Sequence, residues 1–170
     1  MLFRSSPDGS AIAAWDQSAI SGRVFVVRRD ARGQWQQPPR ILATGRIPAW
    51  SPDGRVIAFT TVDGSVASIA ADSGPVRVLY APTQKPGDPI ALTVRWSVDA
   101  GTVFIKGRDS AGHGGIWSLG MRGEQPRLLV RFDDPLRPSD RPDFTSDGKR
   151  FYFTIDDRQS DVSIAALARP

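Results

Sequence analysis

Cysteine is absent from this sequence of 170 residues, which excludes disulfide bonds, thiol nucleophiles and thiolate metal sites. Histidine is nearly absent, and we interpret the single His113 as a loop surface residue rather than a metal ligand or base. No apolar run approaches the roughly 18–20 residues of a membrane-spanning helix. Met1–Trp15 also lacks the apolar core of a signal peptide, so we expect no membrane insertion by this segment and export only if directed from outside the chain.

Catalytic motifs are missing as well. The sequence contains no G-x-S-x-G, P-loop, kinase motif or H-E-x-x-H. The paired acids of Phe132–Pro135 and Ile155–Arg158 lack the alternating spacing of a calcium loop, which favours solvated loop carboxylates. We therefore predict no catalytic residue, no metal site, no cofactor and no enzyme activity.

Lysine is scarce: the 22 basic residues comprise three lysines and 19 arginines. The sequence also has 18 acidic residues. The basic residues are dispersed and interleaved with aspartate rather than clustered. A nucleic-acid footprint needs basic residues gathered on one surface, so the net charge of +4 indicates a solvated mixed surface and no nucleic-acid partner.

What the sequence does contain is a repeat. "SPDG" occurs at Ser6–Gly9 and Ser51–Gly54, and "SVDAG" (Ser97–Gly101) and "TSDG" (Thr145–Gly148) are variants of it. The third turn is expected to carry an additional residue. The predicted structural turn residues are Pro7, Asp8, Gly9, Pro52, Asp53, Gly54, Asp99, Gly101, Asp147 and Gly148. In such a turn proline presets φ, aspartate bonds the local backbone and glycine takes a positive φ.

Short apolar runs recur around each turn, such as "VIAFT" (Val56–Thr60) and "PVRVL" (Pro75–Leu79), bounded by Gly, Pro, Asp or Ser. No window shows a capped helical period. Four short strands per repeat describe a propeller blade, so we predict an all-β propeller with blades 1–44, 45–88, 89–138 and 139–170. Trp50, Trp96 and Phe144 end first strands, where a large ring can wedge between neighbouring blades.

The stretch from Pro48 to Leu79 resembles the WD40-like propeller repeat of TolB-type proteins, and the resemblance extends in four copies over nearly the whole chain. It implies a propeller fold and a periplasmic or other extracytoplasmic location. Similar repeats occur in propellers of prolyl-oligopeptidase-like and tricorn-type peptidases and in sensor domains of bacterial serine/threonine kinases. The first repeat departs from the pattern with Ser5 in place of the aromatic wedge, and Ala67 and Ser163 are small where the repeat carries an aromatic residue.

The fourth repeat offers only three strands, ending with "DVSIAAL" (Asp161–Leu167), so a sixteenth strand is expected to be missing. An incomplete ring would expose apolar blade faces and strand edges. Three arrangements are open: part of a larger propeller, a symmetric dimer of half-propellers, or a closed ring of four blades.

We interpret the chain as a non-catalytic module for protein–protein interaction or ligand sensing. Its partner would be a protein, the missing blades or a second copy. The alternatives are the gating propeller of a serine peptidase or the sensor of a kinase. Binding is predicted on the face that carries the loops between second and third strands and the connections between blades. The candidate binding residues are Arg108, Asp109, His113, Asp134, Arg141 and Arg158.

Overall fold

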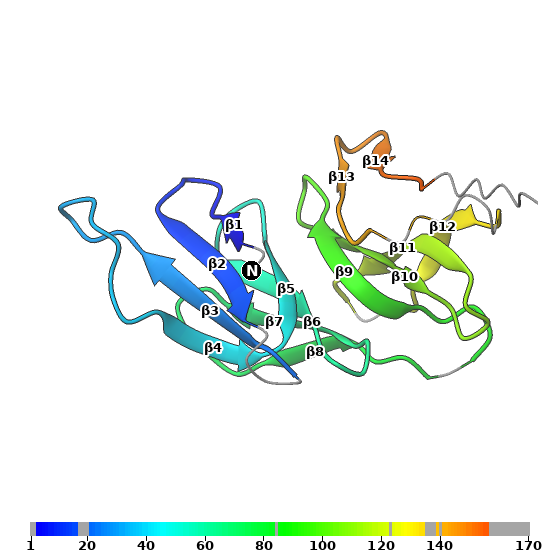
Figure 1. Ribbon diagram of the computed structural model, residues 1–170, viewed down its shortest axis with the longest axis horizontal. Helices are drawn as coiled ribbons and strands as arrows, with labels where there is room; N and C mark the ends of the chain where they lie inside the picture. The colour runs from blue at the N-terminus through cyan, green and yellow to red at the C-terminus, as the bar shows by residue number, and fades with distance from the viewer. Residues whose placement is uncertain are drawn as a thin grey trace, which may run out of the picture.

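A computed structural model describes residues 3–16, 21–83, 85–122, 124–134, 139 and 141–156. Within them, strands form four antiparallel sheets (Figure 1). The first sheet contains β1 (Phe3–Ser5), β2 (Ala11–Asp16), β3 (Arg23–Arg28) and β4 (Arg40–Thr44). The second contains β5 (Arg46–Trp50), β6 (Val56–Thr60), β7 (Val66–Ala70) and β8 (Arg77–Tyr80). The third contains β9 (Ile90–Trp96), β10 (Thr102–Arg108), β11 (Gly114–Gly120) and β12 (Arg127–Phe132), and the fourth contains β13 (Phe144–Ser146) and β14 (Phe151–Phe153).

Each sheet follows the chain, with sequential strands as hydrogen-bonded neighbours, and we call the four sheets blades 1 to 4. The first strands β1, β5, β9 and β13 lie toward the middle of the molecule, and β4, β8 and β12 lie at its outside (Figure 1). The predicted all-β propeller class is confirmed, and the described residues form part of such a propeller.

Packing between blades explains why the strands are apolar at successive positions. Ile57 and Phe59 of β6 face blade 1, where they join a core with Trp15, and both are fully buried. Ala58, between them, points the other way into a core with Val103 of blade 3. A sheet covered on both faces needs apolar residues on both, so the strict polar alternation of a half-exposed sheet is lost.

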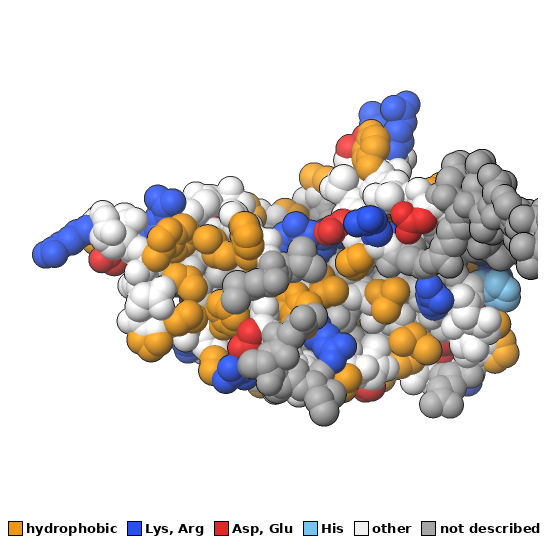
Figure 2. Space-filling model, in the orientation of Figure 1, with side chains coloured by type: hydrophobic (Ala, Val, Ile, Leu, Met, Phe, Trp, Pro, Cys, Tyr) orange, Lys and Arg blue, Asp and Glu red, His pale blue; other side chains and the backbone are white. Residues whose placement is uncertain are grey.

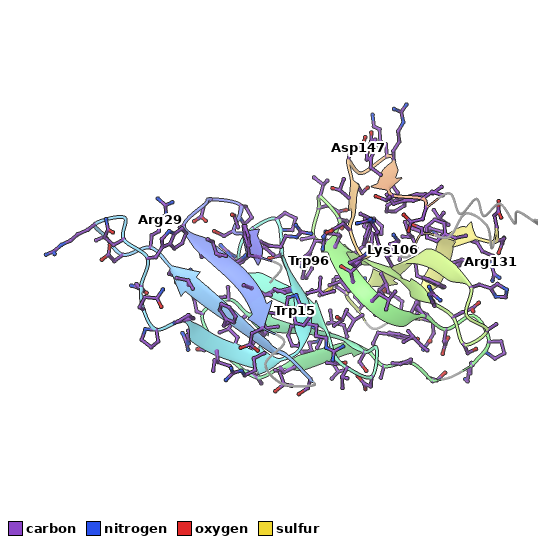
Figure 3. All side chains as sticks on the ribbon, in the orientation of Figure 1. Trp15, Arg29, Trp96, Lys106, Arg131 and Asp147 are labelled. Atoms are coloured by element: carbon purple, nitrogen blue, oxygen red, sulfur yellow. The ribbon has the colours of Figure 1, made fainter. Side chains whose placement is uncertain are left out.

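Blade 4 packs on blade 3 through aromatic rings. Phe104 and Phe151 meet edge to face with ring centroids 4.9 Å apart, and Phe132 lies 4.9 Å from Phe153. Lys106 is buried at this junction, where its Nζ donates to Ser139 Oγ at 2.8 Å (Figure 3). The predicted third strand of blade 4 lies outside the described residues.

The turns before β2, β6 and β10 share one hydrogen-bonding scheme. In the turn after Trp50, Ser51 Oγ donates to Asp53 Oδ1 at 2.6 Å and accepts the Val56 amide at 2.9 Å. The Arg55 amide also donates to Asp53 Oδ1. The serine hydroxyl therefore links the carboxylate to the first amide of the next strand, a role that the sequence reading did not assign to it.

The third turn differs from its sequence interpretation. Ala100 takes a φ of 58°, and its amide donates to Ser97 O as the Gly54 amide donates to Ser51 O. Gly101 then occupies the place of Arg55, with its amide on Asp99 Oδ1 at 3.0 Å. The expectation of an additional residue is therefore wrong, because alanine accepts the left-handed conformation in place of glycine.

The two tryptophans that end first strands each donate to the preceding blade. Trp50 Nε1 donates to Arg4 O at 2.9 Å, and Trp96 Nε1 donates to Ala49 O at 3.1 Å. Phe144 holds the same repeat position in blade 4 and is buried without an N–H to donate. The prediction that it ends a first strand is wrong, because Phe144 begins β13, which continues to Ser146 through its pairing with β14. Among the described residues, no helix is long and apolar enough to cross a membrane.

Candidate functional site

The loop between β10 and β11 brings two predicted binding residues together. Asp109 Oδ1 accepts the amides of Ala111 and His113 at 3.0 and 2.9 Å, and the Asp109 amide donates back to His113 O. This closes a tight loop in which the Asp109 side chain is buried. Burial acts to raise the pKa of Asp109, but the two amides and the nearby imidazole outweigh it and leave the pKa below its usual value.

The second oxygen of Asp109 faces an imidazole and a guanidinium group. His113 Nδ1 lies 3.4 Å from Asp109 Oδ2, and Arg131 on β12 lies 3.9 Å from the same oxygen. Arg131 also lies 3.7 Å from Asp133 (Figure 3). Half of the His113 side chain is exposed, so this cluster presents an imidazole and a guanidinium to solvent. Arg131 was not a sequence candidate, because only the pairing of β11 with β12 brings it beside the loop.

The other predicted binding residues are less closely grouped. Arg108 and Asp134 are exposed, and Arg108 ends β10 directly before the loop. Arg141 Nε lies 3.8 Å from Asp156 Oδ1, while its backbone carbonyl accepts Lys106 Nζ. Arg158 lies outside the described residues. The binding role of all six residues stays a prediction.

The long connection from blade 2 to blade 3 is held against the same loop. Ser110 Oγ donates to Lys85 O at 3.5 Å, and Trp117 Nε1 donates to Gly87 O at 3.2 Å. Tyr80 OH donates to Pro89 O at 3.0 Å, and burial together with the charge of Asp88 raises the pKa of Tyr80 to about 12. The connection therefore forms one surface with the Asp109 loop, at the opposite end of blade 3 from the turn at Ser97.

The surface around the Asp109 loop is polar and carries an imidazole, a guanidinium and carboxylates. In the described part of the chain, no group of three His, Cys, Asp or Glu side chains is placed to hold a metal ion. The carboxylate of Asp109 is engaged by backbone amides, so its main effect is to fix the loop shape that displays His113.

Comparison with known proteins places the fold. No family model matches the chain, and no curated protein sequence matches it. Among solved structures, a TolB protein from Acinetobacter baumannii has a TM-score of 0.57 at 16% identity, covering 92% of this chain and 41% of that chain. A TolB from Agrobacterium tumefaciens has a TM-score of 0.55 at 20% identity, covering 78% of this chain and 46% of that one. A structure from a study of two prolyl endopeptidases has a TM-score of 0.53 at 20% identity, covering 78% of this chain and 22% of that chain.

These likenesses define the class as a β-propeller. Within that class, the chain resembles the TolB-like propellers, as its repeats predict. At these identities the likeness shows the fold alone. The chain spans less than half the length of each of these three structures.

Proposed function

We propose that this chain is a non-catalytic propeller unit for protein interaction or ligand sensing, and that it works as part of a larger propeller assembly. One observation carries the proposal: the face of blade 1 that points away from blade 2 is apolar and uncovered in the described residues. The next two units of the repeat, blades 2 and 3, bury the same face against the preceding blade.

The uncovered face crosses three strands. Phe3, Ala14 and Phe25 form one row by direct cross-strand pairing, and Ile12 pairs with Val27 in the next row. Phe3 is 60% exposed, Ile12, Phe25 and Val27 are half-buried, and the small Ala14 is buried beneath its neighbours. Figure 2 shows hydrophobic side chains gathered over β2 and β3 on the near face of blade 1.

The repeat shows what such a face normally contacts. The counterparts of Ile12 are Ile57 in blade 2 and Val103 in blade 3, and both are fully buried against the preceding blade. The counterpart of Phe3 in blade 3 is Val94, which is also fully buried. Apolar positions that are fully buried in blades 2 and 3, but half-buried or exposed at Ile12 and Phe3 of blade 1, indicate that a blade covers them in the assembled protein.

The occupant that fits is another blade of this repeat type. Blade 1 meets blade 2 with the small residues Ala11 and Ala13, and a blade with such a surface suits the large rings of Phe3 and Phe25. The described outer face of blade 4 is more polar, since it presents Thr145, Tyr152 and Thr154. A blade from outside the described residues is therefore the better match. An extracytoplasmic location is part of the proposal and is supported by the repeat resemblance alone.

Sedimentation velocity tests the face. In isolation the chain has only other copies to supply a blade, so we expect concentration-dependent association that Phe3→Asp removes. Val78→Asp is the matched control, because Val78 is 61% exposed at an outer-strand position that is exposed in all three blades with a described outer strand. A chain that stays monomeric at all concentrations, or an association that both variants remove equally, would overturn the proposal.

A further inference from the structure

The residues directly before the first-strand wedges form a layer at the centre of the molecule. In chain order they are Arg4, Ala49, Arg95 and Asp143, one from each blade. Trp50 and Trp96 donate to the carbonyls of Arg4 and Ala49, which fixes the backbone at these positions. The side chains of the layer are therefore presented from rigid inner strands.

Two arginines of this layer share one carboxylate. Arg4 NH2 lies 2.6 Å from Asp143 Oδ1, and Arg95 NH2 lies 3.3 Å from the same oxygen. Arg95 also donates to Val94 O at 2.8 Å, and its guanidinium lies 5.7 Å from the ring centroid of Phe144. The cluster joins blades 1, 3 and 4 across 139 residues of sequence.

The charges in this cluster are not balanced, since two guanidinium groups face one carboxylate. The Arg95 side chain is only 16% exposed, whereas Asp143 is 61% exposed. Burial, with the like charge of Arg4, lowers the pKa of Arg95 to about 10 against the opposing effect of Asp143. Arg95 still carries its charge at neutral pH, and a second anion would compensate it.

An open cavity of about 570 Å³ adjoins the two arginines. Its wall includes the hydroxyl-bearing side chains Thr145, Tyr152 and Thr154. The volume suits a small organic molecule, and the lining offers guanidinium groups, the hydroxyls of Thr145 and Thr154 and the ring of Phe144. The Tyr152 hydroxyl donates to Asp147 Oδ2 at 2.9 Å.

We propose that this cavity binds a small organic anion whose carboxylate or phosphate group is held by Arg4 and Arg95, with Asp143 acting as an internal competitor. The guanidinium fork suits either group, because both offer two oxygens in one plane. The site is separate from the apolar face of blade 1, since Arg4 pairs with Ala13 on the side of β1 opposite to Phe3. The tests of the two proposals probe different residues, Phe3 for the first and Arg95 for the second, so their outcomes can be distinguished.

Amide NMR titration with three probes tests the site: benzoate, inorganic phosphate, and benzyl alcohol as the uncharged control. We expect saturable shifts at Arg95 and Phe144 with at least one anion and none with benzyl alcohol. Benzoate alone would indicate an aromatic carboxylate ligand, and phosphate alone a phosphorylated one. Saturation by neither anion, or equal shifts with benzyl alcohol, would overturn the proposal.

Variants separate binding from structure. Arg95→Gln and the more exposed Arg4→Gln should each weaken anion binding about tenfold, the loss expected for one charge-assisted bond. Asp143→Asn should strengthen binding severalfold, because it removes the competitor. If the Asp143 carboxylate only holds the blades together, Asp143→Asn should instead destabilise the fold and leave the affinity for the anion unchanged. Arg40→Gln, on the outer strand β4, is the matched control and should leave binding unchanged. Unaltered binding in both Arg4→Gln and Arg95→Gln would contradict the assignment.

Discussion

At the scale of single residues, the hairpin turns show how much the sequence could reveal. Asp53 and Gly54 were predicted as turn formers, and the structure adds the Ser51 hydroxyl that links the carboxylate to the next strand. Ala100 was misread, because a residue's tolerance of positive φ depends on the surrounding turn rather than on its type alone. Arg131 was missed because its partner Asp109 comes near only when β11 pairs with β12. Arg95 was missed because its partner Asp143 comes near only when blades 3 and 4 assemble.

The left-handed Ala100 allows a test of the corrected turn. Ala100→Gly should raise the free energy of unfolding by about 0.5 kcal/mol, because relief of the strained φ exceeds the entropy that glycine adds to the unfolded chain. Gly54→Ala should lower it by about 1 kcal/mol, because its φ of 70° suits glycine. Urea denaturation measures both. If both variants changed the free energy of unfolding in the same direction, the assignment of Ala100 to the turn position of Gly54 would be contradicted.

The turn carboxylates should make stability depend on acid pH. Hydroxyl donation from Ser6, with the Ser10 amide, lowers the pKa of Asp8 to about 2, and the pKa values of Asp53 and Asp99 are lowered by the same kind of bonds. A carboxyl whose pKa is lower in the folded chain than in the unfolded chain stabilises the fold above its unfolded pKa. That contribution is lost as the pH falls through the folded value, so stability should decline from about pH 4 to about pH 2.

Urea midpoints measured across this window check the pH dependence. Asp8→Asn should show a smaller decline than the parent chain, because it no longer has a carboxylate to protonate in that turn. Asp72→Asn replaces an exposed carboxylate outside the turns, so the urea midpoint of this variant should fall with pH as the midpoint of the parent chain does. Identical curves for all three proteins would exclude the turns as the source.

At the scale of elements, the repeat predicted the strand order because its turn residues and apolar runs are local features. The strand limits were less predictable. β9 extends over Ile90–Trp96 because it pairs with nearly the whole length of β10. The third and fourth strands of blades 1, 2 and 3 each contain a register shift at the same repeat position, at Phe25, Ala67 and Trp117. Such shifts depend on two strands at once and have no local sequence pattern.

Gly107 shows how closely two strands of blade 3 approach. A Cβ at this position of β10 would collide with the Ile90 carbonyl oxygen of β9. Gly107→Ala should therefore lower the free energy of unfolding by about 1–3 kcal/mol, the usual range for overpacking. Gly101→Ala is the control, because its added Cβ would meet only Asp99 at ordinary contact distance. Equal melting temperatures for the two variants would contradict the close approach.

At the scale of the whole molecule, the sequence predicted an incomplete propeller, and the apolar face of blade 1 now gives that prediction a physical basis. Phe3 is 60% exposed where its counterpart Val94 is fully buried. The loop surface around His113 and the cavity beside Arg95 belong to different parts of the same unit. Partner binding and anion binding can therefore be tested separately.

The absence of cysteine makes thiol labelling the most direct measurement of the central claim, because single cysteines introduce the only reactive thiol. Under reducing conditions, the labelling rate of Phe3→Cys should fall as protein concentration rises, since another blade covers the face. The rate of Val78→Cys should stay constant, because this outer-strand position is exposed in blades 1, 2 and 3. Equal, concentration-independent rates at both positions would contradict the claim that the outer face of blade 1 is built to pack against another blade.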